Sequence, residues 1–410
     1  MLVGLPLLIC TWMLAWGGMK LSLPALPELE HVFNVPGHDL RVTVTIFFVC
    51  FALGQLAWGI ISDHFGRRWP LIIGLMIGAL GSTVVLFSGD VIFFGIGRCL
   101  EGLGLSAVSP IGRAIVFQTR GATEGSHALA RVGSCTALVP LLGQVLGGYI
   151  VAYASWRWIF GGFLIANVLV IVAIWWRLAE PPPLQSTEPE IGLGRRLIRI
   201  LRHPAFWSNT IMYMTCSGTL LGYYAAMPFW YADHLDVPIQ VYPWLAAFTV
   251  GTYMLGLLCS RFLAKRMNAQ RLMWIGMVLA MIPGILFLTM TWTLSSNTEN
   301  ITLLVGASMI LAAGASLVFP GANAGAIKSF PQWSGLVSAA ILTCVFVAAG
   351  VTAYTLGSAN PTNLHDVGWN LLAPPAIGLV AGSLFHMMAK RSMAHPNDPV
   401  PPHQTSHQTM

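Results

Sequence analysis

The sequence has very little charge. Asp, Glu, Lys and Arg together make up 9% of its 410 residues, whereas hydrophobic residues make up 56%. Soluble globular domains carry roughly 25% charged residues, so the chain falls outside that class. A helix that crosses a bilayer needs about 20 mostly apolar residues, and apolar runs of that kind recur along the sequence. These features indicate an integral membrane protein.

The sequence also lacks the motifs of several other protein classes. Its seven cysteines lie singly in apolar runs, with no C-x-x-C pair and no metal-ligand spacing, so they are interpreted as packing residues. No Walker loop for ATP is present. A membrane enzyme would need a nucleophile or metal constellation at membrane depth, but the histidines lie mostly in loops or tails. We therefore expect no enzyme activity, no catalytic residue, no cofactor and no bound metal.

Twelve apolar runs, separated by polar or turn-rich breaks, predict twelve membrane-spanning helices. The predicted spans are 2–23, 42–61, 69–88, 91–117, 127–153, 158–178, 207–231, 243–264, 272–293, 301–326, 335–357 and 369–389. A signal peptide is the alternative for the first run, but that run has no basic n-region and no evident cleavage site. The expected fold class is therefore all-α and integral to the membrane.

The net charge of +6 follows the expected topology. Basic residues gather in alternate loops, and the positive-inside rule then places both termini in the cytoplasm. No nucleic-acid partner is expected, because topology explains the charge.

The longest internal polar segment divides the twelve spans into two groups of six. We expect an N-terminal bundle (1–178), a cytoplasmic linker (179–206), a C-terminal bundle (207–391) and a disordered cytoplasmic tail (392–410). The linker begins proline-rich and ends basic and amphipathic. We expect this basic part on the inner leaflet, with Ile198 and Leu201 facing lipid; binding of a partner is the alternative.

The stretch "FALGQLAWGIISDHFGRRWPL" (51–71) resembles the signature loop of the major facilitator superfamily, G-x-x-x-D-x-x-G-R-R. The matching residues are Gly59, Asp63, Gly66, Arg67 and Arg68. A solvated hairpin would explain the arginines, but not the glycines and the acid. The resemblance implies two six-helix bundles and a gating role for this loop. We expect Gly59 to allow close helix approach, Gly66 to permit a tight turn, and Asp63 to pair across the interface between bundles.

Further motifs are similar to the bicyclomycin-resistance type of drug:proton antiporter within that superfamily. They include "PALP" (24–27), "GRCLEGLG" (97–104), "GRAIV" (112–116), "VPLLGQVLGGYI" (139–150), "SWRWIF" (155–160), "MPFWY" (227–231) and "PQWSGLVSA" (331–339). The resemblance assigns gating to Pro140, Gly143 and Gly147. Three positions depart from the family pattern: Lys20 replaces an acid, Glu101 replaces a glutamine, and Gln144 replaces a proline.

Charged residues inside spans are costly and usually functional. Lys20 lies roughly 6 Å below the expected exit of the first span, while Arg98 and Glu101 lie roughly 10–15 Å deep. Arg98 and Glu101 are three residues apart and can pair. We expect all three to line a central site, with Arg113 anchoring the cytoplasmic end of the 91–117 span. The alternatives are a snorkelling Lys20 and a purely structural ion pair for Arg98.

Aromatic residues supply candidate walls for the same substrate site. Trp16, Tyr223 and Tyr224 are expected to line it, although packing against lipid or at the interface explains such residues equally well.

These features predict a proton-coupled efflux transporter that works by alternating access, with Glu101 carrying the proton. The excess of positive charge at Lys20 and Arg98 favours an anionic or carboxylate-bearing substrate, such as a metabolite or siderophore. A general multidrug antiporter is the alternative; an importer, a facilitator or a non-transporting sensor are further alternatives. The expected partners are a small-molecule substrate, protons and membrane lipid, and we expect a monomer in a bacterial inner membrane.

Overall fold

The computed structural model describes residues 4–20, 22–136, 138–180, 193–233, 237, 241–293, 301–330, 333–358 and 364–394. No strand occurs among these residues, so the all-α prediction is confirmed for them. The tail beyond 394 and the proline-rich part of the linker, 181–192, lie outside the described residues.

The helices follow one another along the chain with short connections. The first half contains α1 (Leu5–Lys20), η1 (Leu23–Ala25), α2 (Leu26–Phe33), α3 (Gly37–Phe65), α4 (Arg68–Leu86), α5 (Val91–Leu105), α6 (Val108–Thr136), α7 (Val139–Tyr153) and α8 (Trp156–Arg177). The second half contains α9 (Leu193–Arg202), α10 (Pro204–Asp233), α11 (Tyr242–Leu263), α12 (Ala269–Thr293), α13 (Ile301–Ser329), α14 (Ser334–Ser358) and α15 (Leu364–Ala394).

Every predicted span overlaps at least one of these helices, but two spans are broken. The 91–117 span is divided between α5 and α6 at Ser106, and the 127–153 span is divided after Thr136. A proline follows each break by four residues, Pro110 and Pro140 respectively. A proline ring clashes with the carbonyl four residues earlier and supplies no amide hydrogen, which explains both breaks. In the described residues, ten helices are long and apolar enough to cross a membrane.

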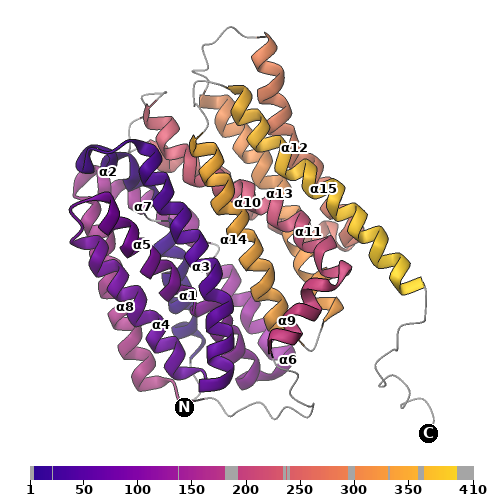
Figure 1. The fold of residues 1–410 in the computed structure, drawn as a ribbon, viewed down its shortest axis with the longest axis horizontal. Helices are drawn as coiled ribbons and strands as arrows, with labels where there is room; N and C mark the ends of the chain where they lie inside the picture. Colours follow the sequence, from indigo (N-terminus) through magenta and orange to yellow (C-terminus); the bar gives the residue numbers. More distant parts are fainter. Residues whose placement is uncertain are drawn as a thin grey trace.

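The two halves of the chain form two groups of helices that lie side by side (Figure 1). The groups meet mainly where α3 packs on α14 and where α7 packs on α11. At the end of the molecule that holds α2, helix α10 also contacts η1 and α2. Helix α9 lies towards the opposite end (Figure 1).

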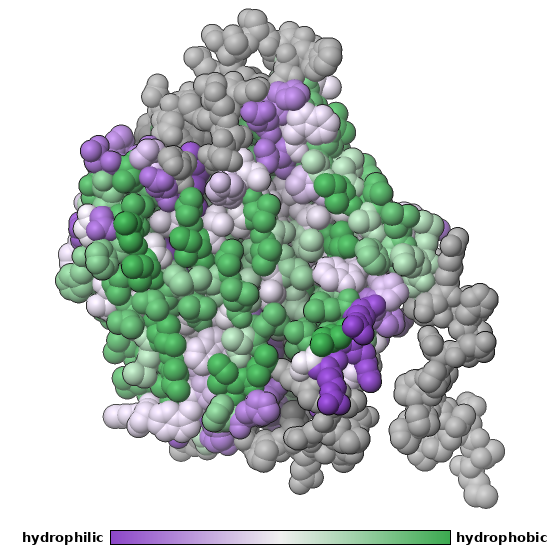
Figure 2. All heavy atoms as spheres, in the orientation of Figure 1, coloured by the Kyte–Doolittle hydropathy of each residue, from purple (hydrophilic) through white to green (hydrophobic). Residues whose placement is uncertain are grey.

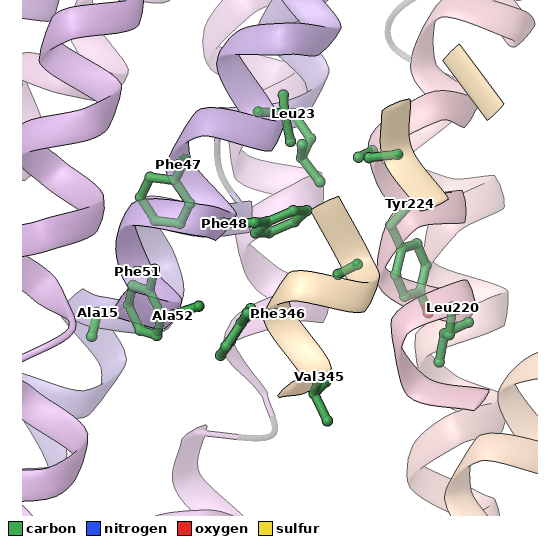
Figure 3. Packing of buried hydrophobic residues seen from close by; sticks show 14 of the residues in the cluster. Ala15, Leu23, Phe47, Phe48, Phe51, Ala52, Leu220, Tyr224, Val345 and Phe346 are labelled. Atoms are coloured by element: carbon green, nitrogen blue, oxygen red, sulfur yellow. The ribbon is translucent and has the colours of Figure 1, made fainter. Parts of the chain in front are cut away.

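Aromatic rings fill the α3–α14 contact (Figure 3). The ring of Phe346 on α14 lies 4.8 Å from that of Phe51 and 6.0 Å from that of Phe48, centroid to centroid. The Thr343 hydroxyl donates a hydrogen bond to the Ala52 carbonyl at 3.1 Å. The contact between the groups is therefore mostly apolar, with few specific polar bonds among the described residues.

The face of the molecule seen in Figure 2 is apolar over much of its height, and hydrophilic residues gather towards its ends. Large side chains such as Ile92 and Leu169 are 71% and 64% exposed. Exposed apolar area of this extent suits lipid rather than water.

Helix α9 is the basic amphipathic part of the linker. Ile200 is fully buried, whereas Ile198 and Leu201 are exposed, and the Arg199 guanidinium lies 5.9 Å from the ring centre of Trp333. A hydrophilic patch covers this helix (Figure 2). Contact between Ile198 or Leu201 and lipid stays a prediction.

Candidate functional site

A buried ion pair lies within the first group of helices. Arg98 Nη1 and Glu101 Oε2, both on α5, are 2.6 Å apart, and the two side chains are 2% and 1% exposed. The second carboxylate oxygen, Oε1, accepts a hydrogen bond of 2.6 Å from the Ser82 hydroxyl on α4. Arg98 Nη1 also donates to the Gly18 carbonyl on α1 at 3.2 Å. The pair thus connects three helices.

Aromatic rings close the remaining sides of the pair. The Arg98 guanidinium carbon lies 4.2 Å from the ring centre of Phe47 on α3 and 6.0 Å from that of Phe160 on α8. Such a position over a ring face stabilises a cation, the more so where water is excluded. The site is therefore a sealed charge pair, held by hydrogen bonds and a cation–π contact.

Close packing of α4 on α5 brings Ser82 to the carboxylate. A Cβ at Gly81 would lie 2.5 Å from the Glu101 amide nitrogen, and a Cβ at Gly104 would lie 2.5 Å from the Gly74 carbonyl oxygen. Only glycine permits backbones to approach this closely. The sequence analysis missed Ser82 and Gly18 as partners; a hydroxyl in an apolar run is a weak signal for such a role.

The structure agrees with one expectation for these charges and departs from another. Arg98 and Glu101 do pair, as their spacing predicts. Their side chains, however, are enclosed by α1, α3, α4 and α8 rather than facing the space between the bundles. The side chain of Lys20 lies outside the described residues, so its expected place beside Arg98 stays a prediction.

The three aromatic candidates occupy different places. Trp16 lies at the contact between the two groups of helices, with its ring 6.3 Å from that of Phe346. Tyr223 is buried, and its hydroxyl donates to the Leu304 carbonyl on α13 at 3.1 Å. Tyr224 is also buried, on α10 beside α14 (Figure 3). Tyr223 therefore ties α10 to α13, and its role in substrate binding stays a prediction.

The signature loop forms a second charged cluster. Arg67 Nη1 lies 2.5 Å from Asp63 Oδ1 and donates to the Ser62 hydroxyl at 2.7 Å. Arg68 Nη2 donates to the Trp175 carbonyl on α8 at 2.6 Å. These contacts all lie within the first group of helices. Pairing of Asp63 across the interface is absent from the described contacts of this conformation and stays a prediction.

Glu180, just beyond α8, binds the start of α4. Its carboxylate accepts hydrogen bonds from the backbone amides of Arg67 and Arg68, the latter at 3.0 Å. A carboxylate at a helix N-terminus accepts hydrogen bonds from amides that have no partner within the helix. Its negative charge is also attracted by the positive end of the helix dipole. The sequence analysis did not identify Glu180, because nothing in the local sequence links it to a loop more than a hundred residues earlier.

The two loop glycines differ in what they require. Gly66 has φ of 84°, and a Cβ there would lie 2.5 Å from a Glu180 carboxylate oxygen, so the predicted tight turn is confirmed. A Cβ at Gly59 would meet only Pro110 Cβ, at 3.9 Å. That is an ordinary contact, so the expectation of a close helix approach at Gly59 is wrong in this conformation.

The antiporter-type motif lies on α7, which packs against α11 of the second group and against α1. Gly143 and Gly147 are buried, Pro140 lies at the start of the helix, and its side chain lies outside the described ones. Gating by these three residues stays a prediction.

Arg113 lies on α6, in the second part of the predicted 91–117 span. It lies eight residues before the turn at Gly121, or ~12 Å along the helix. It is partly exposed. Anchoring of the cytoplasmic end of the span by Arg113 stays a prediction.

The described residues form two groups of apolar helices, with charges buried in one group and a mostly apolar contact between the groups. This arrangement is typical of a membrane transporter. A sequence profile described as "Major Facilitator Superfamily" matches residues 8–353. The chain belongs to this superfamily.

Relatives along most of the chain are transporters and resistance proteins. An uncharacterized transporter of Rickettsia felis is 24% identical over 88% of this chain and 90% of its own length. Multidrug resistance protein D of Escherichia coli is 24% identical over 96% of this chain and 98% of its own. A chloramphenicol resistance protein of Pseudomonas aeruginosa is 26% identical over 84% of this chain and 80% of its own. The predicted resemblance to drug-efflux members of the superfamily is confirmed.

A crystal structure of a D-xylose-proton symporter has the same fold, with a TM-score of 0.72 over 93% of this chain and 96% of that one. Sequence identity is 16%, so this likeness concerns the fold alone. It agrees with the predicted twelve-helix major facilitator fold.

Proposed function

We propose that this protein exports small amphiphilic drugs from the cell in exchange for protons, as a multidrug antiporter of the cytoplasmic membrane. Relatives named for multidrug and chloramphenicol resistance support this alternative. They favour it over the carboxylate-bearing metabolite or siderophore that the charges at Lys20 and Arg98 suggest. In this proposal the protein works as a monomer, with both termini in the cytoplasm.

The observation that carries the proposal is the buried pair of Arg98 and Glu101. A single protonation of Glu101 changes the charge of a site whose two side chains are almost fully enclosed. At low dielectric this change has a large effect on the attraction between the two groups. Protonation thus weakens the hold of Glu101 on Arg98, while the Ser82 hydroxyl can turn from donor to acceptor.

Arg98 connects this event to α1. Its Nη1 is shared between Glu101 Oε2 and the Gly18 carbonyl, so a weaker bond to Glu101 favours a closer bond to α1. Two residues earlier, Trp16 contacts Phe346 of α14 in the other bundle. In our proposal the protonation state of Glu101 is therefore sensed at the contact between bundles and biases which side of the protein opens.

The signature loop serves as the gate of this cycle. In the described conformation Asp63 pairs with Arg67 inside one bundle. We propose that the loop contacts the second bundle when the cytoplasmic side closes, and that Asp63 then changes partner.

Transport by purified protein in proteoliposomes tests the proposal. With an imposed pH gradient, we expect accumulation of a neutral drug such as chloramphenicol and little transport of small carboxylates. Abolition of accumulation by a protonophore would identify protons as the driving ion. If the pH gradient drives transport of carboxylates but not of drugs, the proposal is wrong and the substrate is anionic. If drugs bind but nothing is transported, the protein is a sensor.

A further inference from the structure

Two cysteine thiols are in contact within the first group of helices. The Sγ atoms of Cys50 on α3 and Cys99 on α5 are 2.9 Å apart, and either thiol can donate its hydrogen to the other. Both cysteines are free in the described conformation. A disulfide bond is about 2.05 Å long, so a small movement of the two side chains is enough to join the sulfurs.

Close packing of α3 on α5 brings the thiols together. A Cβ at Gly102 would lie 2.6 Å from the Phe47 carbonyl oxygen and 3.2 Å from the Cβ of Cys50. Only glycine permits helices to approach this closely. The backbone positions of the two helices therefore keep the cysteines near each other. The two residues are 49 positions apart along the chain, so the local sequence gives no sign of the contact.

Exposed apolar side chains lie beside the thiol pair. On α3, Val49 is 37% exposed and Leu53 is 57% exposed; on α5, Ile92 is 71% exposed. Ile92 lies seven residues before Cys99, so the two residues differ by about 20° around the helix axis. Cys50 and Cys99 are themselves partly exposed. Exposed apolar area of this kind suits lipid, so a lipid-soluble reagent can reach the thiols.

We propose that Cys50 and Cys99 form an oxidation site, at which a lipid hydroperoxide joins the two thiols in a disulfide between α3 and α5. One sulfur attacks the terminal peroxide oxygen. The S–O bond forms, the O–O bond breaks, and the thiol proton passes to the departing oxygen, which leaves as a lipid alcohol.

The first step leaves a sulfenic acid on one cysteine. The sulfur of the other cysteine then attacks the sulfenic sulfur. The S–S bond forms, the S–O bond breaks, and the hydroxyl leaves as water with the proton of the second thiol. In total the two sulfurs lose two electrons, and the hydroperoxide gains them.

The second thiol distinguishes this site from a single cysteine. A thiol in apolar surroundings reacts slowly by itself, and its sulfenic acid can be oxidised further to irreversible products. Here a partner thiol is already in contact, and such proximity favours the intramolecular reaction. Thiol reductants can reverse the product. The disulfide would tie α3, which packs on α14, to the helix that carries Arg98 and Glu101.

Purified protein in phosphatidylcholine vesicles tests the site. The probe is the hydroperoxide of linoleoyl phosphatidylcholine, incorporated into the vesicles, with catalase in the buffer to remove hydrogen peroxide. Mass spectrometry of the digested protein should find the Cys50 and Cys99 peptides linked to each other, and dithiothreitol should release them. Vesicles of unoxidised lipid should give at least tenfold less of the linked peptide. This readout uses the unaltered protein, so it does not depend on the folding of a variant.

Removal of one partner thiol provides the second readout. In Cys50→Ser the sulfenic acid on Cys99 has no partner, so its labelling by dimedone should rise at least fivefold over the unaltered protein. Cys10 and Cys259 are two exposed cysteines elsewhere in the chain. The matched control is the double variant Cys10→Ser with Cys259→Ser, in which the Cys50–Cys99 linkage should form as in the unaltered protein.

Three results would overturn the inference. They are an absence of the linked peptide in oxidised vesicles, equal amounts of it in oxidised and unoxidised vesicles, and dimedone labelling of Cys99 that Cys50→Ser leaves unchanged. Neither readout involves transport, so the outcome is separate from that of the export proposal.

Discussion

Arg98 and Glu101 lie three residues apart on α5 and form an ion pair of 2.6 Å that is closed off on every side described. Removing one partner of such a pair leaves a buried charge uncompensated, whereas removing both does not. Single and double variants can therefore distinguish the contribution of the pair to stability from its role in coupling transport to protons.

The coupling role predicts the behaviour of Glu101→Gln. The amide cannot exchange a proton, so accumulation driven by a pH gradient should be abolished, while exchange between two pools of substrate should persist. Transport assays in proteoliposomes under both conditions measure this. Gradient-driven accumulation retained in the variant would move proton coupling to another residue.

The stability role predicts a non-additive pair of variants. Arg98→Met or Glu101→Met alone should lower the free energy of unfolding by about 3–5 kcal/mol, because each leaves a buried charged partner behind. The double variant Arg98→Met with Glu101→Met should recover much of the loss. Unfolding of the four proteins in one detergent gives the comparison, and additive losses would indicate that the pair is not sealed.

Substitution of Asp63 should reduce transport without reducing the affinity for substrate. Its carboxylate pairs with Arg67 at 2.5 Å but is 45% exposed, so Asp63→Asn should fold normally and bind substrate. Transport should fall about fivefold or more if the loop biases the two conformations. Substrate affinity, measured on the same preparation, is the control. A parallel fall in affinity would make Asp63 part of the site or of the fold.

Substitutions of Glu180 and of Gly66 should both destabilise the signature loop, and their effects should be coupled. Glu180→Ala removes the acceptor for two amides at the start of α4 and should cost about 1 kcal/mol, as for other N-terminal caps. Gly66→Ala should cost ~1–3 kcal/mol, because φ is 84° and the new methyl meets the carboxylate. The double variant should lose less than the sum, since one clash disappears. If the double variant instead loses the full sum of the two single losses, only the backbone conformation of Gly66, and not the contact with Glu180, determines the cost of Gly66→Ala.

His203 predicts a pH dependence of stability at the start of α10. Burial lowers the pKa of this imidazole, and its Nδ1 accepts a hydrogen bond from the Ala205 amide at 3.2 Å. The unfolded chain, with a pKa of about 6.5, then binds the proton more readily than the folded protein. Stability is therefore present above about pH 6.5 and is lost as pH falls through the lowered folded pKa.

The control for that prediction is His203→Asn, which keeps an acceptor for the Ala205 amide but does not titrate. Unfolding between pH 5 and 8 should show a smaller loss at low pH in this variant. The same loss in both proteins would assign the pH dependence to other groups.

Much of the architecture could be predicted from the sequence, because a membrane imposes its main requirement, a long apolar helix, on each segment separately. Each span must be long and apolar by itself, so composition predicted the class and apolar runs predicted the helices. The signature loop predicted the superfamily. The predicted turn at Gly66 also held, since only glycine adopts that backbone conformation readily. Even the breaks near Ser106 and Thr136 had a local signal, in Pro110 and Pro140.

The tertiary structure alone decided what each buried charge meets. Spacing predicted that Arg98 and Glu101 share a helix face, but not that the face points at Ser82 and Gly18 inside one bundle. It gave no sign that Glu180 binds the signature loop. These features depend on how each helix is rotated and which helices become neighbours. That rotation is determined by close packing between segments distant in the chain, such as Gly81 against Glu101, and a single sequence carries little trace of it.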